Sequence, residues 1–343
     1  MSGKLNWGIL GTGRIARMFA TALAASRTGR LVAVGSRTPA AAEQFAANFG
    51  GITAHGSYKA LLADPAVRVV YIGTPHDSHA ELCVRAAQAG KHILCEKPLA
   101  LNRADAARAV AAAQAHRVFL MEAFMYRCHP QTARLAELVR GGAIGELRLI
   151  SAVFGFNRPV NPALRLYNRA LGGGAILDIG CYPVSIARLV AGAAQGRPFT
   201  EPVEFLGTGR IHPVAQVDEQ AAATLKFPGG ALAQLACGTT MAKEIAVRIY
   251  GTEGIIHLPV PFHPGFPPEG PGRIIVQRPG AAAEEIACDP GGDLYAIEAD
   301  TVGDAIARGE TESTAMSQAD SLGNMAVLDT WRAAIGMRYA GEA

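Results

Sequence analysis

Over about the first 120 of its 343 residues, this chain alternates between strand and helix patterns, and no other feature limits its possible folds as strongly. The short apolar runs are typical of strands buried on both faces, and Pro and Gly stand where intervening helices would begin and end. We predict strands over residues 5–10, 31–35, 52–54, 67–72, 92–95 and 118–121. Strands that alternate with helices form parallel β-α-β units, so this part is predicted to be an α/β, doubly wound Rossmann sheet.

The pattern changes after about Phe124, where strands begin to follow one another. We predict helices over residues 130–140, 174–190, 293–308 and 317–335, and strands over 147–156, 205–211, 220–227, 231–239, 244–250, 254–257 and 273–277. Strands in series with flanking helices indicate an α+β domain. We therefore expect two domains, at residues 1–123 and 124–343, in keeping with the chain length. The Pro- and Gly-rich segment 263–272 is expected to be a surface loop.

Composition and charge exclude several classes of protein. With 50% hydrophobic and 18% charged residues, the chain is too apolar to be intrinsically disordered. The 32 Lys and Arg residues against 29 Asp and Glu give a net charge of +3 without a long basic run, which argues against nucleic acid or an anionic membrane as partner. We find no stretch of about 18 uncharged apolar residues that would predict a transmembrane helix. The first residues also lack the features of a signal peptide.

The six cysteines are scattered along the chain and form no CxxC pair. This spacing argues against a disulfide framework or a zinc site, so no metal is expected. Unpaired thiols are typical of a reducing compartment, and we therefore expect a cytoplasmic protein.

The turn between the first predicted strand and helix carries a glycine motif, GILGTGRIA at residues 8–16. Its G-x-G-x-x-A core provides Gly11 for a tight turn, Gly13 for close approach of a pyrophosphate and Ala16 for close helix–strand packing. The helix N-terminus also attracts an anion. A chance glycine-rich turn is the alternative, but a strand and a helix flank the motif as dinucleotide binding requires. We therefore predict a dinucleotide site at this turn.

The end of the second predicted strand indicates which dinucleotide is bound. An NAD enzyme places a carboxylate there, about 20 residues past the glycines, to bond the ribose 2′-hydroxyl. This chain has Ser36 and Arg37 instead, which can bond and pair with a 2′-phosphate. A solvated surface arginine is the alternative interpretation. We therefore expect NADP as the cofactor and favour it over NAD.

Polar clusters follow two of the predicted strands, at the edge where such sheets bind ligands. Residues 74–79, TPHDSH, follow one strand, and residues 96–98, EKP, follow another. His76 and His79 could be metal ligands, but no matching cluster accompanies them, so loop or cofactor contacts are favoured. A lysine directly after a buried strand is costly without a function, which makes Lys97 a candidate for chemistry. A surface lysine is the alternative.

A second candidate for chemistry lies in the segment GGGAILDIGCY, residues 172–182. Asp178 and Tyr182 are four residues apart, so they would share one face of a helix. An acid beside a phenol can serve catalysis, or it can be a hydrogen-bonded packing pair. The pattern by itself leaves both interpretations open.

Taken together, these segments resemble the glucose–fructose oxidoreductase/inositol dehydrogenase (Gfo/Idh/MocA) family of NAD(P)-dependent sugar oxidoreductases. The matching segments follow the family's order along the chain: GILGTGRIA, GTPHDSH, ILCEKPLALN, MEAFMYRCHPQ, GGGAILDIGCYP and YAIEADTVGDAIARGETES. The EAFMYR and DIGxYP segments are most similar to the branch of dimeric dihydrodiol dehydrogenases and NADP-dependent xylose dehydrogenases. The resemblance implies a second domain with a large, open, mostly antiparallel sheet. Such a sheet commonly forms an oligomer interface, so a homodimer or a dimer of dimers is expected.

The resemblance also implies roles for individual residues. It places Lys97 near the nicotinamide and the reacting oxygen, with Tyr182 and Asp178 completing the catalytic set. Many members carry His where this chain has Tyr182, so inositol-type chemistry with a histidine base is disfavoured. The residues implied at the cofactor are Gly11, Thr12, Gly13, Arg14, Ile15, Ser36, Arg37, Thr74, Pro75, His76, His79, Glu96, Lys97, Ala123 and Arg165. The residues implied at the substrate are Lys97, Arg127, Phe154, Asp178 and Tyr182.

We therefore expect an NADP-dependent oxidoreductase that transfers hydride between the nicotinamide and a carbinol or carbonyl carbon of a sugar or cyclic diol. Tyr182, with its pKa lowered by Lys97, would act as the acid or base. Two alternatives from the same family are a non-enzymatic NADP-binding regulator and an NAD-dependent glycoside hydrolase. The substrate itself cannot be read from any motif.

Overall fold

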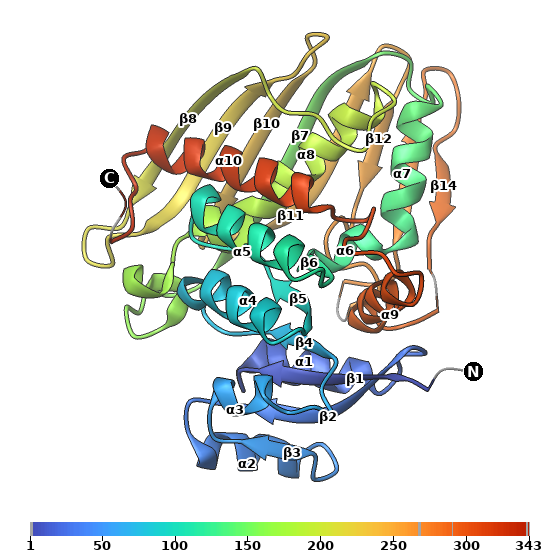
Figure 1. Cartoon of the computed structure of the whole chain (residues 1–343). Coiled ribbons are helices and arrows are strands. Elements are labelled where there is room, and N and C mark those ends of the chain that lie inside the picture. The colour runs from blue at the N-terminus through green and yellow to red at the C-terminus, as the bar shows by residue number, and fades with distance from the viewer. Residues whose placement is uncertain (1–2, 267–268, 290, 341, 343) are drawn as a thin grey trace. The chain divides into compact units, whose positions relative to one another are not determined.

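The computed structural model describes residues 3–266, 269–289, 291–340 and 342 (Figure 1). The chain divides into two compact units. The first comprises Met1–Ala100, Ala104–Cys128 and Gly291–Ser321, and the second comprises Leu101–Arg103, His129–Pro290 and Leu322–Ala343. The chain therefore returns to the first unit near its end, and no sequence pattern signalled this return. The domain boundary after residue 123 stays a prediction.

Six parallel strands form the sheet of the first unit, in the order β3-β2-β1-β4-β5-β6. The strands are β1 (Leu5–Leu10), β2 (Gly29–Gly35), β3 (Thr53–His55), β4 (Val69–Ile72), β5 (His92–Glu96) and β6 (Leu120–Ala123). Every residue of β4 is buried, as its continuous apolar run predicts. The strand order reverses between β1 and β4, and ligands bind at such a switch point, outside the carboxyl ends of the strands. The Rossmann prediction is confirmed.

Helices α2 and α3 of the first unit begin at residues whose side chains cap them. The side chains of Thr38 and Ser57 accept hydrogen bonds from backbone N–H groups in the first turns of α2 and α3. The 3₁₀ turn η1 (His76–Ser78) leads into α4, and α9 packs against α1 and α6. The helices are α1 (Arg14–Leu23), α2 (Pro39–Ala47), α3 (Tyr58–Leu62), α4 (His79–Gln88), α5 (Arg103–Ala115), α6 (Met125–Cys128) and α9 (Leu294–Ala307).

Eight strands form the sheet of the second unit, in the order β14-β13-β12-β11-β7-β10-β9-β8. Each neighbouring pair is antiparallel except β7 and β10, which are parallel. The prediction of an α+β domain with a mostly antiparallel sheet is therefore confirmed. The strands are β7 (Leu147–Asn157), β8 (Glu204–Ile211), β9 (Asp218–Lys226), β10 (Leu232–Gly238), β11 (Thr240–Gly251), β12 (Ile255–Leu258), β13 (Arg273–Gln277) and β14 (Glu284–Ala287).

One helix forms the centre of the second unit. Helix α8 (Cys181–Ala193) packs on β7 and β10, with α7 (Pro130–Arg140) beside it, and every residue of α8 is buried. Within the described chain, the helical stretch Arg169–Ala193 is long and apolar enough by composition to cross a bilayer, but its apolar part is wholly buried in this unit. Such burial is that of a core helix, so the composition of the stretch reflects packing. Helix α10 (Gln318–Ala334) closes the chain's regular structure.

The structure differs from the predicted elements mainly around the start of α8. A helix was expected over 174–190, but a π-helical turn, η4 (Ile176–Gly180), precedes α8. Two 3₁₀ turns, η2 (Arg165–Tyr167) and η3 (Arg169–Leu171), lead into it. A π-helical turn inserts one extra residue into the ladder and occurs often at functional sites. The distortion therefore falls on the segment that carries Asp178.

Candidate active site

The glycine turn between β1 and α1 has the geometry that a pyrophosphate needs. Gly11 has a φ of +105°, and a Cβ there would lie 2.8 Å from the carbonyl oxygen of Gly73, so only glycine fits. Gly13 is the N-cap of α1, and no described atom lies within 4 Å of where its Cβ would stand. Thr12, Arg14 and Ile15 are at least partly exposed around it. The space beside Gly13 is therefore open, as close approach of an anion to the N-terminus of α1 requires.

The end of β2 presents one buried and one exposed polar residue. Ser36 is buried, and its backbone N–H donates to the carbonyl oxygen of His55 at 3.1 Å. Arg37 is exposed, and its charge acts on Asp77 and Tyr58. Burial raises the pKa of Asp77, and the nearby guanidinium opposes that rise. An exposed arginine without a neighbouring β2 carboxylate is the arrangement that suits a 2′-phosphate.

His79 links the loops that follow β4 and β5. The residue is fully buried, with Nδ1 2.8 Å from the carbonyl oxygen of Pro98 and Nε2 2.9 Å from that of Thr74. In the Thr74 loop, the hydroxyl of Ser78 donates to Thr74 Oγ1 at 2.7 Å. Among the residues that the structure describes, no group of three His, Cys, Asp or Glu side chains is placed to hold a metal ion. His79 therefore holds the sheet's ligand edge together, and His76 and Pro75 lie beside it in the same loop.

The backbone around Lys97 is fixed on both sides. The carboxylate of Glu96 accepts hydrogen bonds from the Tyr71 hydroxyl at 2.6 Å and from the Lys97 N–H at 3.2 Å. Next along the loop, the N–H of Leu99 donates to Glu122 Oε1 at 2.8 Å. The Lys97 side chain is half-buried between buried neighbours. The loop therefore holds the Lys97 backbone at a fixed point of the sheet's carboxyl edge.

Burial raises the pKa of the Tyr71 hydroxyl well above its ordinary value, and the charge and hydrogen bond of Glu96 add to that rise. Tyr71 therefore stays protonated, and its hydroxyl donates a hydrogen bond to the Glu96 carboxylate. Ala123 is the register partner of Glu96 on β6 and is also buried. Glu96 and Ala123 thus lie together at the edge where the resemblance places the nicotinamide.

Arg127, which the resemblance places at the substrate, is engaged within the first unit. Its guanidinium lies 2.7 Å from a carboxylate oxygen of Asp320, and both side chains are buried. Burial acts to lower the pKa of Arg127, but Asp320 and Tyr126 raise it further, and the net direction is upward. The arginine is therefore charged and anchored by Asp320, and its substrate role stays a prediction.

In the second unit, a glycine turn leads into the segment that carries Asp178. Gly172 and Gly174 have φ angles of +74° and +123°. Asp178 forms an ion pair with Arg165, whose Nη2 donates to Asp178 Oδ1 at 2.7 Å. The Asp178 carboxylate is largely buried, whereas Arg165 is partly exposed. The structure thus brings together a predicted catalytic acid and a predicted cofactor-region arginine.

Tyr182, in the first turn of α8, lies in a cluster of aromatic rings within the second unit. Its ring centroid is 5.3 Å from that of Phe154 on β7, 5.1 Å from Phe262 and 6.0 Å from His263. Phe154 also stacks on Phe262 at 5.6 Å. The predicted substrate residue Phe154 and the predicted acid Tyr182 are therefore neighbours.

No sequence motif singled out Phe262 and His263. The sequence predicts a surface loop over residues 263–272, but Phe262 directly before it is fully buried and His263 is half-buried. Residues 267–268 of that segment lie outside the described residues. The available signal was the aromatic content of PVPFHPGF, because a solvent-exposed Pro- and Gly-rich loop rarely needs three aromatic rings.

The fold and the first glycine turn define a dinucleotide-binding oxidoreductase with a second α+β domain. The chain belongs to the Gfo/Idh/MocA family. The profile of its N-terminal domain, an oxidoreductase family with an NAD-binding Rossmann fold, matches residues 5–124, and that of the GFO/IDH/MocA C-terminal domain matches residues 132–257. The predicted family, the oxidoreductase class and a nicotinamide dinucleotide cofactor are confirmed.

Similar proteins include an uncharacterised oxidoreductase, ORF334, of Rhizobium meliloti, 35% identical over 330 residues that cover 95% of each chain. The trans-1,2-dihydrobenzene-1,2-diol dehydrogenase of Xenopus laevis is 33% identical over 340 residues, covering 97% of this chain and 98% of that protein. Among solved structures, KijD10, a 3-ketoreductase of Actinomadura kijaniata in complex with NADP and TDP-benzene, has a TM-score of 0.85 and 31% identity. That likeness covers 97% of this chain and 98% of the KijD10 chain.

Proposed function

We propose that this protein is an NADP-dependent oxidoreductase that interconverts a carbinol and a carbonyl carbon of a sugar or cyclic diol. The observation that carries the proposal is the fixed Lys97 loop after β5, in a unit whose glycine turn leaves open space beside Gly13 at the start of α1. A lysine held at this edge can polarise an oxygen beside a dinucleotide bound at the same edge.

The preference for NADP rests on the end of β2. Arg37 is exposed, Ser36 precedes it, and no carboxylate stands there to repel a 2′-phosphate. KijD10 is solved in complex with NADP, which supports the same choice. NADP, when bound, supplies or accepts the hydride.

The protein's own residues would manage the proton and the oxygen. Tyr182 takes the hydroxyl proton during oxidation and returns it during reduction. Lys97 donates an N–H to the reacting oxygen and stabilises the alkoxide charge that develops on it. Asp178, oriented by Arg165, holds a further substrate hydroxyl.

The aromatic cluster around Tyr182 supports a ring-shaped substrate. Phe154 and Phe262 make the surroundings of the Tyr182 phenol apolar and aromatic, and such surroundings suit the C–H surface of a sugar or a cyclic diol. The activities named for two similar proteins are of the proposed kind, since one is a dehydrogenase of a cyclic dihydrodiol and the other is a 3-ketoreductase.

We also propose that the protein acts in the cytoplasm as a homodimer or a dimer of dimers, with no nucleic acid or membrane as partner. None of the six cysteines forms a disulfide, and all six lie in the described chain, which supports a reducing compartment. The near-neutral charge balance supports the absence of polyanionic partners.

The experiment is a panel of aldoses, trans-dihydrodiols and anhydroketoses with NADP⁺, NADPH, NAD⁺ or NADH, followed at the nicotinamide absorbance. We expect turnover with at least one class and a preference for the phosphorylated cofactor. NADP⁺ binding without turnover of any compound would instead favour a regulatory protein. Nucleotide that stays bound through extensive dilution would favour a glycoside hydrolase.

A further inference from the structure

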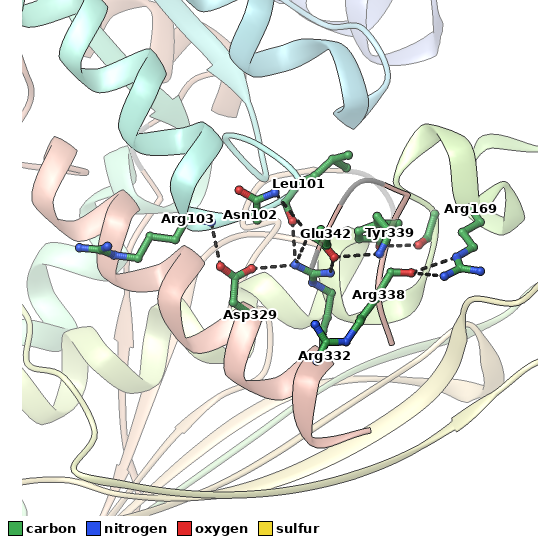
Figure 2. A network of polar contacts seen from close by, with 10 residues as sticks. Leu101, Asn102, Arg103, Arg169, Asp329, Arg332, Arg338, Tyr339 and Glu342 are labelled. Carbon is green, nitrogen blue, oxygen red and sulfur yellow. Dashed lines mark hydrogen bonds and ion pairs between the residues drawn. The ribbon is translucent and has the colours of Figure 1, made fainter. Parts of the chain in front are cut away.

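The C-terminal segment, residues 337–340 and 342, is fastened to the glycine turn that precedes Asp178. The hydroxyl of Tyr339 donates to the carbonyl oxygen of Gly173 at 2.6 Å, and Tyr339 is buried. The guanidinium of Arg169, in η3, donates twice to the carbonyl oxygen of Arg338, at 2.9 and 2.5 Å. Figure 2 shows the Arg169 guanidinium directed at the Arg338 carbonyl, next to Tyr339. Two neighbouring residues of the segment therefore hold two points of the turn region.

The segment is itself held by a charged network centred on Arg332 (Figure 2). Arg332 donates to both carboxylate oxygens of Glu342, at 2.7 and 2.9 Å, and lies 4.8 Å from the ring centroid of Tyr339. Glu342 also accepts the N–H of Tyr339 at 2.8 Å. Because Arg332 is nearly fully buried, these bonds are shielded from water. The network fixes the position from which the Tyr339 hydroxyl reaches Gly173.

Further bonds fasten this network to the rest of the second unit. Arg332 donates to Asp329 at 2.8 Å and to the carbonyl oxygen of Leu101 at 3.1 Å. Asp329 in turn accepts the N–H of Arg103 at 2.8 Å, and Asn102 donates to Glu342 at 3.3 Å. The anchor thus involves α10 and the segment 101–103 together, as Figure 2 shows.

A displacement of Gly173 would move Asp178 as well, because the backbone of the turn connects them. A Cβ at Gly173 would lie 2.7 Å from the carbonyl oxygens of both Arg165 and Leu166, so the turn is packed against the backbone of η2. The N–H of Gly174 donates to Leu166 O at 2.9 Å, and the N–H of Asp178 donates to Gly174 O at 3.2 Å. The same backbone therefore carries the Tyr339 contact and both partners of the Arg165–Asp178 ion pair.

We propose that Tyr339 is a positioning residue for the reaction. The C-terminal segment fixes the position of the Arg165–Asp178 ion pair through the hydrogen bond from Tyr339 to the Gly173 carbonyl. This inference rests on the proposed function, in which that pair holds the substrate. Tyr339 does not touch the substrate and acts only by fixing the turn.

The test compares Tyr339→Phe with Thr330→Val. The Thr330 hydroxyl also donates to a backbone carbonyl, that of Ala326 at 2.9 Å, but this bond lies within α10 and Thr330 is exposed. We expect Tyr339→Phe to raise the KM of the organic substrate about three- to tenfold, the effect of losing one hydrogen bond, while its circular dichroism spectrum stays that of the unmodified protein. Thr330→Val should keep the KM of the unmodified protein. Equal KM changes in both variants, or none in Tyr339→Phe, would overturn the proposal.

A second readout does not depend on activity. Amide hydrogen exchange of residues 173–178 should speed up in Tyr339→Phe and stay at the wild-type rate in Thr330→Val. Unchanged exchange at these amides in Tyr339→Phe would refute the positioning role even in an active enzyme. If no substrate is turned over while exchange changes as expected, the proposed function fails but the structural coupling stands.

Discussion

Tyr182 carries the sharpest test of the proposed chemistry. Tyr182→Phe removes the phenol oxygen while its ring still packs against Phe154 and Phe262. We expect kcat to fall about 10²–10⁴-fold, the usual contribution of a general acid or base. NADPH affinity, measured by fluorescence titration, should barely change.

Lys97→Met should lower kcat similarly, and the double variant should be little worse than either single one, because the two groups would act as a unit. If Tyr182 were only a packing residue, Tyr182→Phe would cost about 0.5–1.5 kcal/mol of stability and leave turnover intact. A fully active Tyr182→Phe enzyme would thus transfer the acid–base role to Lys97.

Arg37 decides the cofactor preference in this proposal. A charge-assisted pair with a 2′-phosphate contributes about 1.5–3 kcal/mol, so Arg37→Asp should raise the KM for NADP⁺ at least tenfold and favour NAD⁺. Arg30→Asp makes the same charge change at the other end of β2, on another exposed arginine, and should leave the preference unchanged. Tighter binding of NAD⁺ than of NADP⁺ by the unmodified protein would reject the role of Arg37.

The regular helices and strands could be predicted because each has a local signal. Pro130 and Gly141 bracket α7, and β4 is a continuous apolar run, so their patterns leave little choice. The π-helical turn at Ile176–Gly180 has no such signal, because residues far along the chain hold it and the turn before it. The N–H of Ile176 donates to Asp218, and the carbonyl of Gly173 accepts from Tyr339. The glycines of the turn were visible in the sequence, but their partners were not.

The same limit applies to the candidate site. Gly11, Gly13 and Lys97 could be found from their places after strands, since a sheet edge is a local consequence of the strand pattern. Phe262 could not be assigned to Tyr182, because their 5.1 Å contact joins a loop and a helix about 80 residues apart in sequence.

Asp218 makes the stability of the π-helical turn depend on pH. Its Oδ2 accepts the N–H of Ile176 at 2.6 Å, and burial raises the pKa of this carboxyl from the ordinary 3.8 to about 6. An acid whose folded pKa is raised holds its proton more tightly in the folded state, so its contribution to stability falls as pH rises from about 4 to about 6. The difference of about two pKa units corresponds to about 3 kcal/mol.

Asp218→Asn keeps an oxygen that can accept the Ile176 N–H but cannot ionise. The free energy of unfolding of the variant, relative to that of the unmodified protein, should therefore increase by up to about 3 kcal/mol between pH 4 and pH 7. Urea unfolding at several pH values in that range measures this difference. A difference that does not vary with pH would show that Asp218 does not titrate there.

Assembly is predicted from the open face of the second unit's sheet. Leu206 on β8 pairs in register with Thr224, which pairs with Gln234, and Leu232 pairs with Lys226. These side chains lie on the face opposite the one that α8 covers, where Leu206 is 75% and Leu232 40% exposed. Large exposed leucines on a wide sheet face suit a self-complementary contact with a second copy of the chain.

We therefore expect a homodimer, or a dimer of dimers, by light scattering at micromolar concentration. The double variant Leu206→Lys and Leu232→Lys should dissociate it, because two ammonium groups on each copy would have to be buried in the contact. Ala40→Lys, on the exposed side of α2 in the first unit, adds the same kind of charge elsewhere and should leave assembly intact. A mass of 35.8 kDa for the unmodified protein, that of one chain, would mean that the sheet face does not mediate self-association.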